Sequence, residues 1–98
     1  MKIVNYTELA VKNILNELFE NFSAKPNYCD CQLCKSRAAA MALNDLRPRY
    51  VTSDAELMAA KASFQSPSEN AALVAIVMDA IRKVLNEPKH NFKPLTLE

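Results

Sequence analysis

Three cysteines are the residues best suited to chemistry in this 98-residue chain. They are the only cysteines present and lie within six positions, as Cys29, Cys31 and Cys34. The spacing Cys-x-Cys-x-x-Cys lets three sulfurs reach one tetrahedral ion, because structural zinc sites are assembled from such short-range pairs. An odd number of thiols in a reducing compartment favours metal binding over a disulfide framework, and ordinary free thiols are the alternative.

The fourth ligand of such a site stays open. His90 is the only histidine, and it follows the last long helix, so the chain could fold back to bring its imidazole to the cysteines. Asp30, a water molecule or a residue of a second subunit are the other candidates, and His90 could equally lie alone at the surface. We therefore expect Zn²⁺ as the cofactor, held by the three cysteines and, as the candidate fourth ligand, His90.

No catalytic residue is predicted, and we expect the protein not to be an enzyme. Hydrolytic zinc sites usually draw on histidine and carboxylate ligands with a nearby base, whereas three thiolates reduce the Lewis acidity of the ion. A redox reading of Cys31 and Cys34 lacks the βαβ context that would support it. The chain contains no glycine, which excludes phosphate-cradling Walker loops and dinucleotide fingerprints.

Basic residues on either side of the predicted central helix are the candidates for ligand binding. Lys35 and Arg37 lie near its start, and Arg47, Arg49 and Tyr50 follow its end. Arginine matches phosphate oxygens and tyrosine offers a flat face, although simple solvation, or compensation of thiolate charge by the first pair, is an alternative. About 15 Å of helix separates the two pairs, so one small ligand touching both would need a dimer or a bent chain path.

Four helices are predicted to position these residues, with caps that the sequence marks clearly. An asparagine or serine cap with glutamate three residues later indicates capping boxes at Asn5/Glu8, Ser53/Glu56 and Ser66/Glu69. Pro67, at the first helical position after Ser66, strengthens the third of these helix starts. Apolar residues spaced three and four positions apart indicate the first and last helices. The high helix propensity of alanine favours the central helix, which proline ends. The expected helices are 6–22, about 37–46, 54–64 and 67–87, with residues 50–52 extended at most briefly.

Length and composition limit the number of domains, the partners and the location of the protein. The chain fits a single domain over residues 1–98, with a core of 5–90 and a flexible tail of 91–98. With a formal charge of +1, any nucleic-acid interaction must rest on a local cluster of charge, and we expect no direct DNA binding. No apolar run is long enough to cross a membrane. No signal-peptide core follows the first residues, so we expect a cytoplasmic protein without membrane association.

The chain resembles the ComFB, or late competence development protein, family of bacteria over roughly residues 5–90. The resemblance rests on the amphipathic first helix, the Cys-x-Cys-x-x-Cys turn, the final apolar helix and the segment from Ala42 to Val51. The run Leu-Asn-x-Leu-x-Pro-x-Tyr at residues 43–50 is its most specific part.

This resemblance implies an all-α domain of four to five helices with a cysteine-rich zinc turn, forming an intertwined or face-to-face homodimer. It also implies a receptor for a cyclic dinucleotide, cyclic di-GMP or cyclic di-AMP, that signals to a downstream protein. The matching ligand region contains Lys35, Arg37, Arg47, Arg49 and Tyr50. The alternative is a protein interaction module that binds no nucleotide and serves competence or motility regulation.

Overall fold

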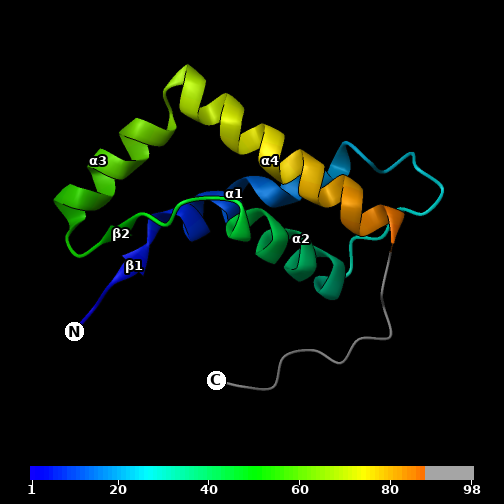
Figure 1. Cartoon of the computed structure of the whole chain (residues 1–98), viewed down its shortest axis with the longest axis horizontal. Helices are drawn as coiled ribbons and strands as arrows, with labels where there is room; N and C mark the ends of the chain where they lie inside the picture. The colour runs from blue at the N-terminus through cyan, green and yellow to red at the C-terminus, as the bar shows by residue number, and fades with distance from the viewer. Residues whose placement is uncertain (88–98) are drawn as a thin grey trace.

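Four helices and one short β ribbon make up the computed structural model, which describes residues 1–87 (Figure 1). In chain order the elements are β1 (Val4–Asn5), α1 (Tyr6–Glu20), α2 (Gln32–Asn44), β2 (Tyr50–Val51), α3 (Asp54–Phe64) and α4 (Pro67–Asn86). None of the helices within residues 1–87 is both long and apolar enough to cross a membrane. The fold is therefore mostly helical, and the expected helices exist close to the positions that the sequence predicts.

Helices α1, α2 and α4 form the core. Their inward faces bury the residues that the helical periodicity selects, because apolar side chains at steps of three and four fall on one stripe. The small side chains of α2 let α4 pack closely against it, and this is the most extensive helix contact in the domain. The largest fully buried apolar side chains are Val11, Phe19, Val77, Ile81, Val84 and Leu85.

The β ribbon corrects the all-α expectation at one end of the molecule. Val4 pairs with Val51 and Asn5 with Tyr50 in an antiparallel register. Two residues on each side are too few for a strand to be recognised by alternation, so only the tertiary pairing reveals it. The ribbon joins the segment after α2 to the start of α1.

Hydrogen bonds fasten the segment that joins α2 to β2 onto the first turn of α1. The amide of Tyr6 donates to the carbonyl of Arg49 at 2.7 Å, and the hydroxyl of Thr7 donates to the carbonyl of Arg47 at 2.8 Å. The side chain of Asn5 accepts from the amides of Thr7 at 3.1 Å and Arg49 at 2.8 Å. We call residues 47–49 the arginine linker, and its backbone is held at both ends.

The predicted helix caps form only in part. Asn5 caps α1 as expected, but Glu8 accepts from Lys12 at 2.8 Å, one turn further along the helix, instead of returning to the cap. Ser53 caps α3 by accepting from the amide of Glu56 at 3.2 Å. The Glu56 carboxylate accepts from the amide of Thr52 at 2.7 Å, one residue before the Ser53 amide that a capping box would use.

The third predicted capping box does not form. Ser66 stands at the cap of α4 with Pro67 in the first turn, but its side chain makes no capping hydrogen bond. Its carbonyl accepts the amide of Asn70 at 2.9 Å, which begins the helix without help from a side chain. The Glu69 carboxylate is consequently not engaged in capping.

Helix α3 extends away from the three-helix core and meets α4 at a corner (Figure 1). Ala60 is its only buried residue. An edge-to-face contact between the rings of Tyr6 and Phe64, with centroids 5.2 Å apart, ties the end of α3 to α1. The angle between α3 and α4 leaves Phe64 beside the arginine linker.

Replacing Thr7 with valine tests how firmly the arginine linker is held. Thr7 is only 1% exposed and its hydrogen bond to the carbonyl of Arg47 is partly buried, so Thr7→Val removes the donor of that carbonyl while keeping the side-chain volume. The free energy of unfolding should fall by about 0.5–1.5 kcal/mol, the usual net contribution of a hydrogen bond. Urea denaturation measures this change. Thr52→Val is the control: it also removes a hydroxyl hydrogen bond, to Glu56, but at an exposed site, so it should cost less stability. Equal losses in both variants would contradict a stabilising attachment of the arginine linker by Thr7.

Candidate functional site

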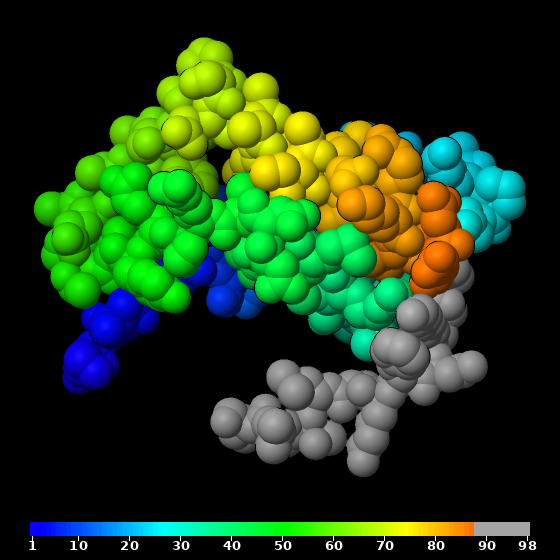
Figure 2. Space-filling view, viewed as in Figure 1, coloured from blue at the N-terminus to red at the C-terminus, as the bar shows by residue number. Residues whose placement is uncertain are grey.

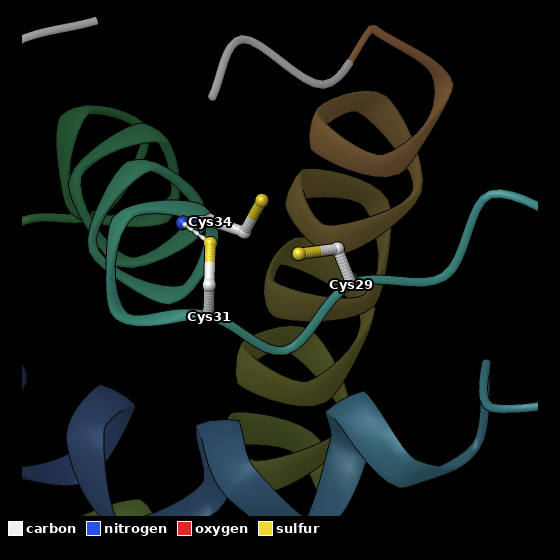
Figure 3. A group of neighbouring side chains, drawn as sticks. All are labelled: Cys29, Cys31 and Cys34. Carbon is white, nitrogen blue, oxygen red and sulfur yellow. Dashed lines mark hydrogen bonds between the residues drawn. The ribbon is translucent and has the colours of Figure 1, made fainter. Parts of the chain in front are cut away.

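The three cysteine sulfurs converge on one point, as Figure 3 shows. All three Sγ atoms lie within 4.8 Å of one another. Cys31 is the N-cap of α2, Cys34 lies in its first turn, and Cys29 approaches from the preceding loop. Cysteines distant by five positions are thus brought together by a turn followed by a helix start, as their spacing predicts.

Local hydrogen bonds hold this arrangement. The amide of Cys34 donates to the sulfur of Cys31 at 3.4 Å, so a thiol takes the place of the usual capping hydroxyl. The loop before it is anchored on two sides: the rings of Tyr28 and Phe19 lie 6.4 Å apart edge to face, and Asn27 donates to the carbonyl of Leu85. The cysteine turn is therefore built against α1 and the end of α4.

Burial makes Cys34 the most protected of the three. Its side chain is 1% exposed, and this burial raises the pKa of its thiol to about 12, with further contributions from hydrogen bonds to Cys31 and Cys29. In the metal-free protein the thiol therefore keeps its proton at neutral pH. A metal ion that binds there must displace that proton, so its affinity rises with pH.

The donor set fits one thiophilic ion. Three sulfurs at ~2.3 Å from a tetrahedral ion stand roughly 3.8 Å apart, which the 4.8 Å cluster reaches with small side-chain adjustments. Within residues 1–87 no histidine, aspartate or glutamate joins the group, Asp30 included. His90, the candidate for the fourth ligand, lies outside the described residues. The cysteines would hold the ion, and the ion would fix the start of α2 without supplying reaction chemistry.

Lys35 and Arg37 lie at the end of α2 that carries the cysteine cluster. Lys35 lines a hollow of about 300 Å³ between α1 and α2, together with Lys12 and Gln32. Arg37 instead reaches α4, where its guanidinium donates to the carbonyl of Glu87 at 3.4 Å. Arg37 thus helps hold the end of α4 near the cysteine turn.

Arg47 and Arg49 line a different hollow, of about 400 Å³, at the other end of α2. We call it the arginine hollow; Figure 2 shows a gap at this place, between the green segment after α2 and the yellow first turns of α4. Its volume falls within the range of about 300–1,000 Å³ that is typical of small-molecule sites. The lining residues are Thr7, Leu46, Arg47, Pro48, Arg49, Phe64, Glu69, Ala72 and Leu73.

The structure therefore divides the predicted ligand residues. The two linker arginines share the arginine hollow, whereas Lys35 lines a separate hollow with no lining residue in common. Tyr50 lies in β2, is 64% exposed and is not among the residues that line the arginine hollow. This division agrees with the separation of the two basic pairs along α2.

Phe64 and Glu69 were not anticipated in the arginine hollow. Sequence periodicity assigns Phe64 to the apolar pattern of α3 and Glu69 to the capping of α4. The two residues reach the arginines because α3 and α4 meet at a corner beside the linker (Figure 1). No local signal in the sequence reports that angle.

Fold and site together define a small helical protein with three clustered cysteines that could hold a metal ion at one end of α2 and an arginine-lined hollow at the other. A family model described as "Late competence development protein ComFB" matches residues 4–88. The chain belongs to the ComFB family.

Two comparisons with individual proteins agree with this membership. "Competence protein ComFB" of Bacillus subtilis (strain 168) is 27% identical over 86 residues, which span 88% of this chain and 85% of that protein. A solved structure of the late competence protein ComFB from Bacillus subtilis aligns with a TM-score of 0.77 and 26% identity, over 91% of this chain and 94% of that one. The chain thus spans nearly the whole of both relatives.

Replacing one cysteine tests the metal centre. Cys34→Ser should abolish the metal content measured by elemental analysis of protein purified without added metal. Loss of the bound ion should also lower the melting temperature, by about 4–8 °C for each kcal/mol of stabilisation removed. Asp30→Asn, which changes a neighbour outside the sulfur cluster, is the control and should retain the metal. Unchanged metal content and melting in Cys34→Ser would show that the cysteines are ordinary thiols.

Proposed function

We propose that this protein is a non-enzymatic receptor for a cyclic dinucleotide, cyclic di-GMP or cyclic di-AMP, which binds in the arginine hollow. The observation that supports this most is the pairing of Arg47 and Arg49 on the wall of a hollow of about 400 Å³ that also contains an aromatic ring. Two guanidinium groups complement two phosphates, and the ring of Phe64 offers a face for a base. The hollow thus offers positive charge for the phosphates and an aromatic residue for a base of this ligand class.

The backbone geometry favours binding without large rearrangement. Hydrogen bonds from Tyr6, Thr7 and Asn5 already hold the linker backbone, so less conformational entropy is lost when a ligand orders the arginine side chains. Within residues 1–87 no ion pair engages the guanidinium of Arg47 or Arg49. Both charges therefore remain available to an anion.

Zinc is the metal that we propose for the cysteine cluster, with a structural role. Thiolate-rich sites favour this ion, and a bound metal adds stability to a small domain whose core is modest. Because α2 runs from the cysteine turn to the arginine linker, an ion that fixes the start of the helix also steadies its far end. Stability and ligand binding would then be linked through α2.

The relatives that carry the name of competence proteins support a regulatory role in bacterial competence, exerted through a downstream partner. In this proposal the ligand changes the surface around the linker, and the partner reads that change. The alternative is a docking module that binds its partner without nucleotide. A pull-down that recovers a specific partner equally with and without dinucleotide would favour the alternative.

A homodimer is the further part of the proposal. Large apolar side chains remain exposed at the ribbon end, including Ile3 at 52%, Tyr50 at 64% and Met58 at 63%. Covering them with a second copy would remove apolar area from water and lower the free energy of the assembly.

Sedimentation tests this assembly. Wild-type protein should sediment as a dimer at micromolar concentration, and Met58→Glu should shift it toward monomer because a charge would be buried in the interface. Lys25→Glu, a charge change at an exposed residue that precedes the cysteines, should leave the dimer intact. A wild-type monomer across the concentration range would contradict the dimer.

Replacing a linker arginine tests the receptor. Arg49→Ala should weaken cyclic-dinucleotide binding at least about tenfold, since a charge-assisted hydrogen bond contributes about 1.5–3 kcal/mol. The melting temperature without ligand should stay close to that of the wild type, because the backbone of Arg49 makes the structural contacts.

Calorimetry provides the measurement, and Arg82→Ala on the exposed face of α4 is the charge-matched control. Arg82→Ala should bind like the wild type. If neither dinucleotide gives binding heat with the wild-type protein at high micromolar concentration, the receptor proposal is wrong.

A further inference from the structure

We propose that Glu69 determines which base the arginine hollow accepts, and that it selects guanine over adenine. The inference rests on the proposed cyclic-dinucleotide receptor and names a residue that reads the base. Glu69 is the only acidic side chain among those that line the hollow. The other lining residues are two arginines, one threonine and apolar residues.

The position of Glu69 in α4 makes its carboxylate available to a ligand. It occupies the place of a capping-box glutamate, but the cap residue Ser66 makes no side-chain hydrogen bond, and no hydrogen bond joins Glu69 to the cap within the described residues. Glu56 provides the contrast, since it occupies the same position in α3 and accepts two hydrogen bonds from Thr52, each at 2.7 Å. Of these two equivalent glutamates, only Glu69 faces a hollow.

Compensation of the arginine charges is not the arrangement observed. No ion pair within 4.0 Å joins Glu69 to Arg47 or Arg49 in the part of the chain that the structure describes. A carboxylate without such a pair would repel an anionic ligand unless it met hydrogen-bond donors on that ligand. Glu69 lies in the first turn of α4, where an acidic side chain also interacts favourably with the helix N-terminus. Beside two arginines, its carboxylate would in addition suit a ligand that carries phosphates and hydrogen-bond donors together.

Guanine supplies the required donors and adenine does not. The Watson–Crick edge of guanine presents N1–H and the 2-amino group side by side, and one carboxylate can accept from both. On adenine the same edge presents the lone pair of N1, which a carboxylate repels, beside a single amino group. A carboxylate in the hollow thus favours guanine and disfavours adenine, and specificity comes from both contributions.

The distribution of the other groups is consistent with this assignment. The guanidinium groups of Arg47 and Arg49 come from the linker, whereas Glu69 and the adjoining Ala72 and Leu73 come from α4. Phosphates on the linker side would place a base toward the first turns of α4. Glu69 is exposed without ligand and would lose its water only when the base covers it.

The test compares three cyclic dinucleotides by calorimetry on the full-length protein: cyclic di-GMP, cyclic di-AMP and cyclic di-IMP. The wild type should bind cyclic di-GMP at least about tenfold more tightly than cyclic di-AMP. Cyclic di-IMP keeps N1–H but lacks the 2-amino group, so it should bind with intermediate affinity. These wild-type measurements need no variant and do not depend on the folding of a mutant.

Glu69→Gln then tests the residue itself. Its amide can accept from the amino group of adenine and donate to N1, so the variant should lose affinity for cyclic di-GMP at least about tenfold and gain affinity for cyclic di-AMP. Glu17→Gln removes an exposed carboxylate of α1 outside the hollow and is the charge-matched control. It should keep the wild-type order of affinities.

The outcomes separate the two proposals. A preference that reverses in Glu69→Gln and persists in Glu17→Gln supports Glu69 as the base-selecting residue. If the wild type binds a dinucleotide and Glu69→Gln leaves the ratio of affinities unchanged, this inference is wrong while the receptor stands. If the wild type binds none of the three, the receptor proposal and the inference both fail.

Discussion

The fastening of the arginine linker to the first turn of α1 is the interaction on which the candidate binding site depends. The buried hydroxyl of Thr7 and the amide of Tyr6 satisfy the carbonyls of Arg47 and Arg49, two residues apart. With the linker backbone held, Arg47 and Arg49 both line the same hollow. Without these bonds, a segment that has no secondary structure of its own would present its charges to water in many arrangements.

Helix α2 connects the fastened arginine linker to the cysteine cluster. One end of the helix begins at Cys31, whose sulfur caps it, and the other end leads directly into the linker. Close packing of its alanines on α4 makes α2 a rigid connection between the two sites. An ion held by the cysteines would therefore act on the same element that positions the arginines, although the two sites share no residue.

Predictability from sequence differed between the two sites for a physical reason. The cysteine cluster is local: its three ligands lie within six positions, and a turn plus one helical turn is enough to bring them together. The arginine hollow is not local, because its walls come from α1, the linker, α3 and α4. Arg47 and Arg49 were recognisable as charged residues after a helix, but Phe64 and Glu69 carried no mark of their role.

The amino-acid sequence by itself determined the four helices, the buried stripes and the sulfur cluster, because periodicity, propensity and short spacing act over a few residues. It also identified the family through the cysteine turn and the run at residues 43–50. The tertiary structure alone decided the β ribbon, the release of Glu69 from capping and the angle between α3 and α4. These features depend on contacts between segments forty or more positions apart, such as Thr7 with Arg47 and Val4 with Val51, or on how whole helices pack.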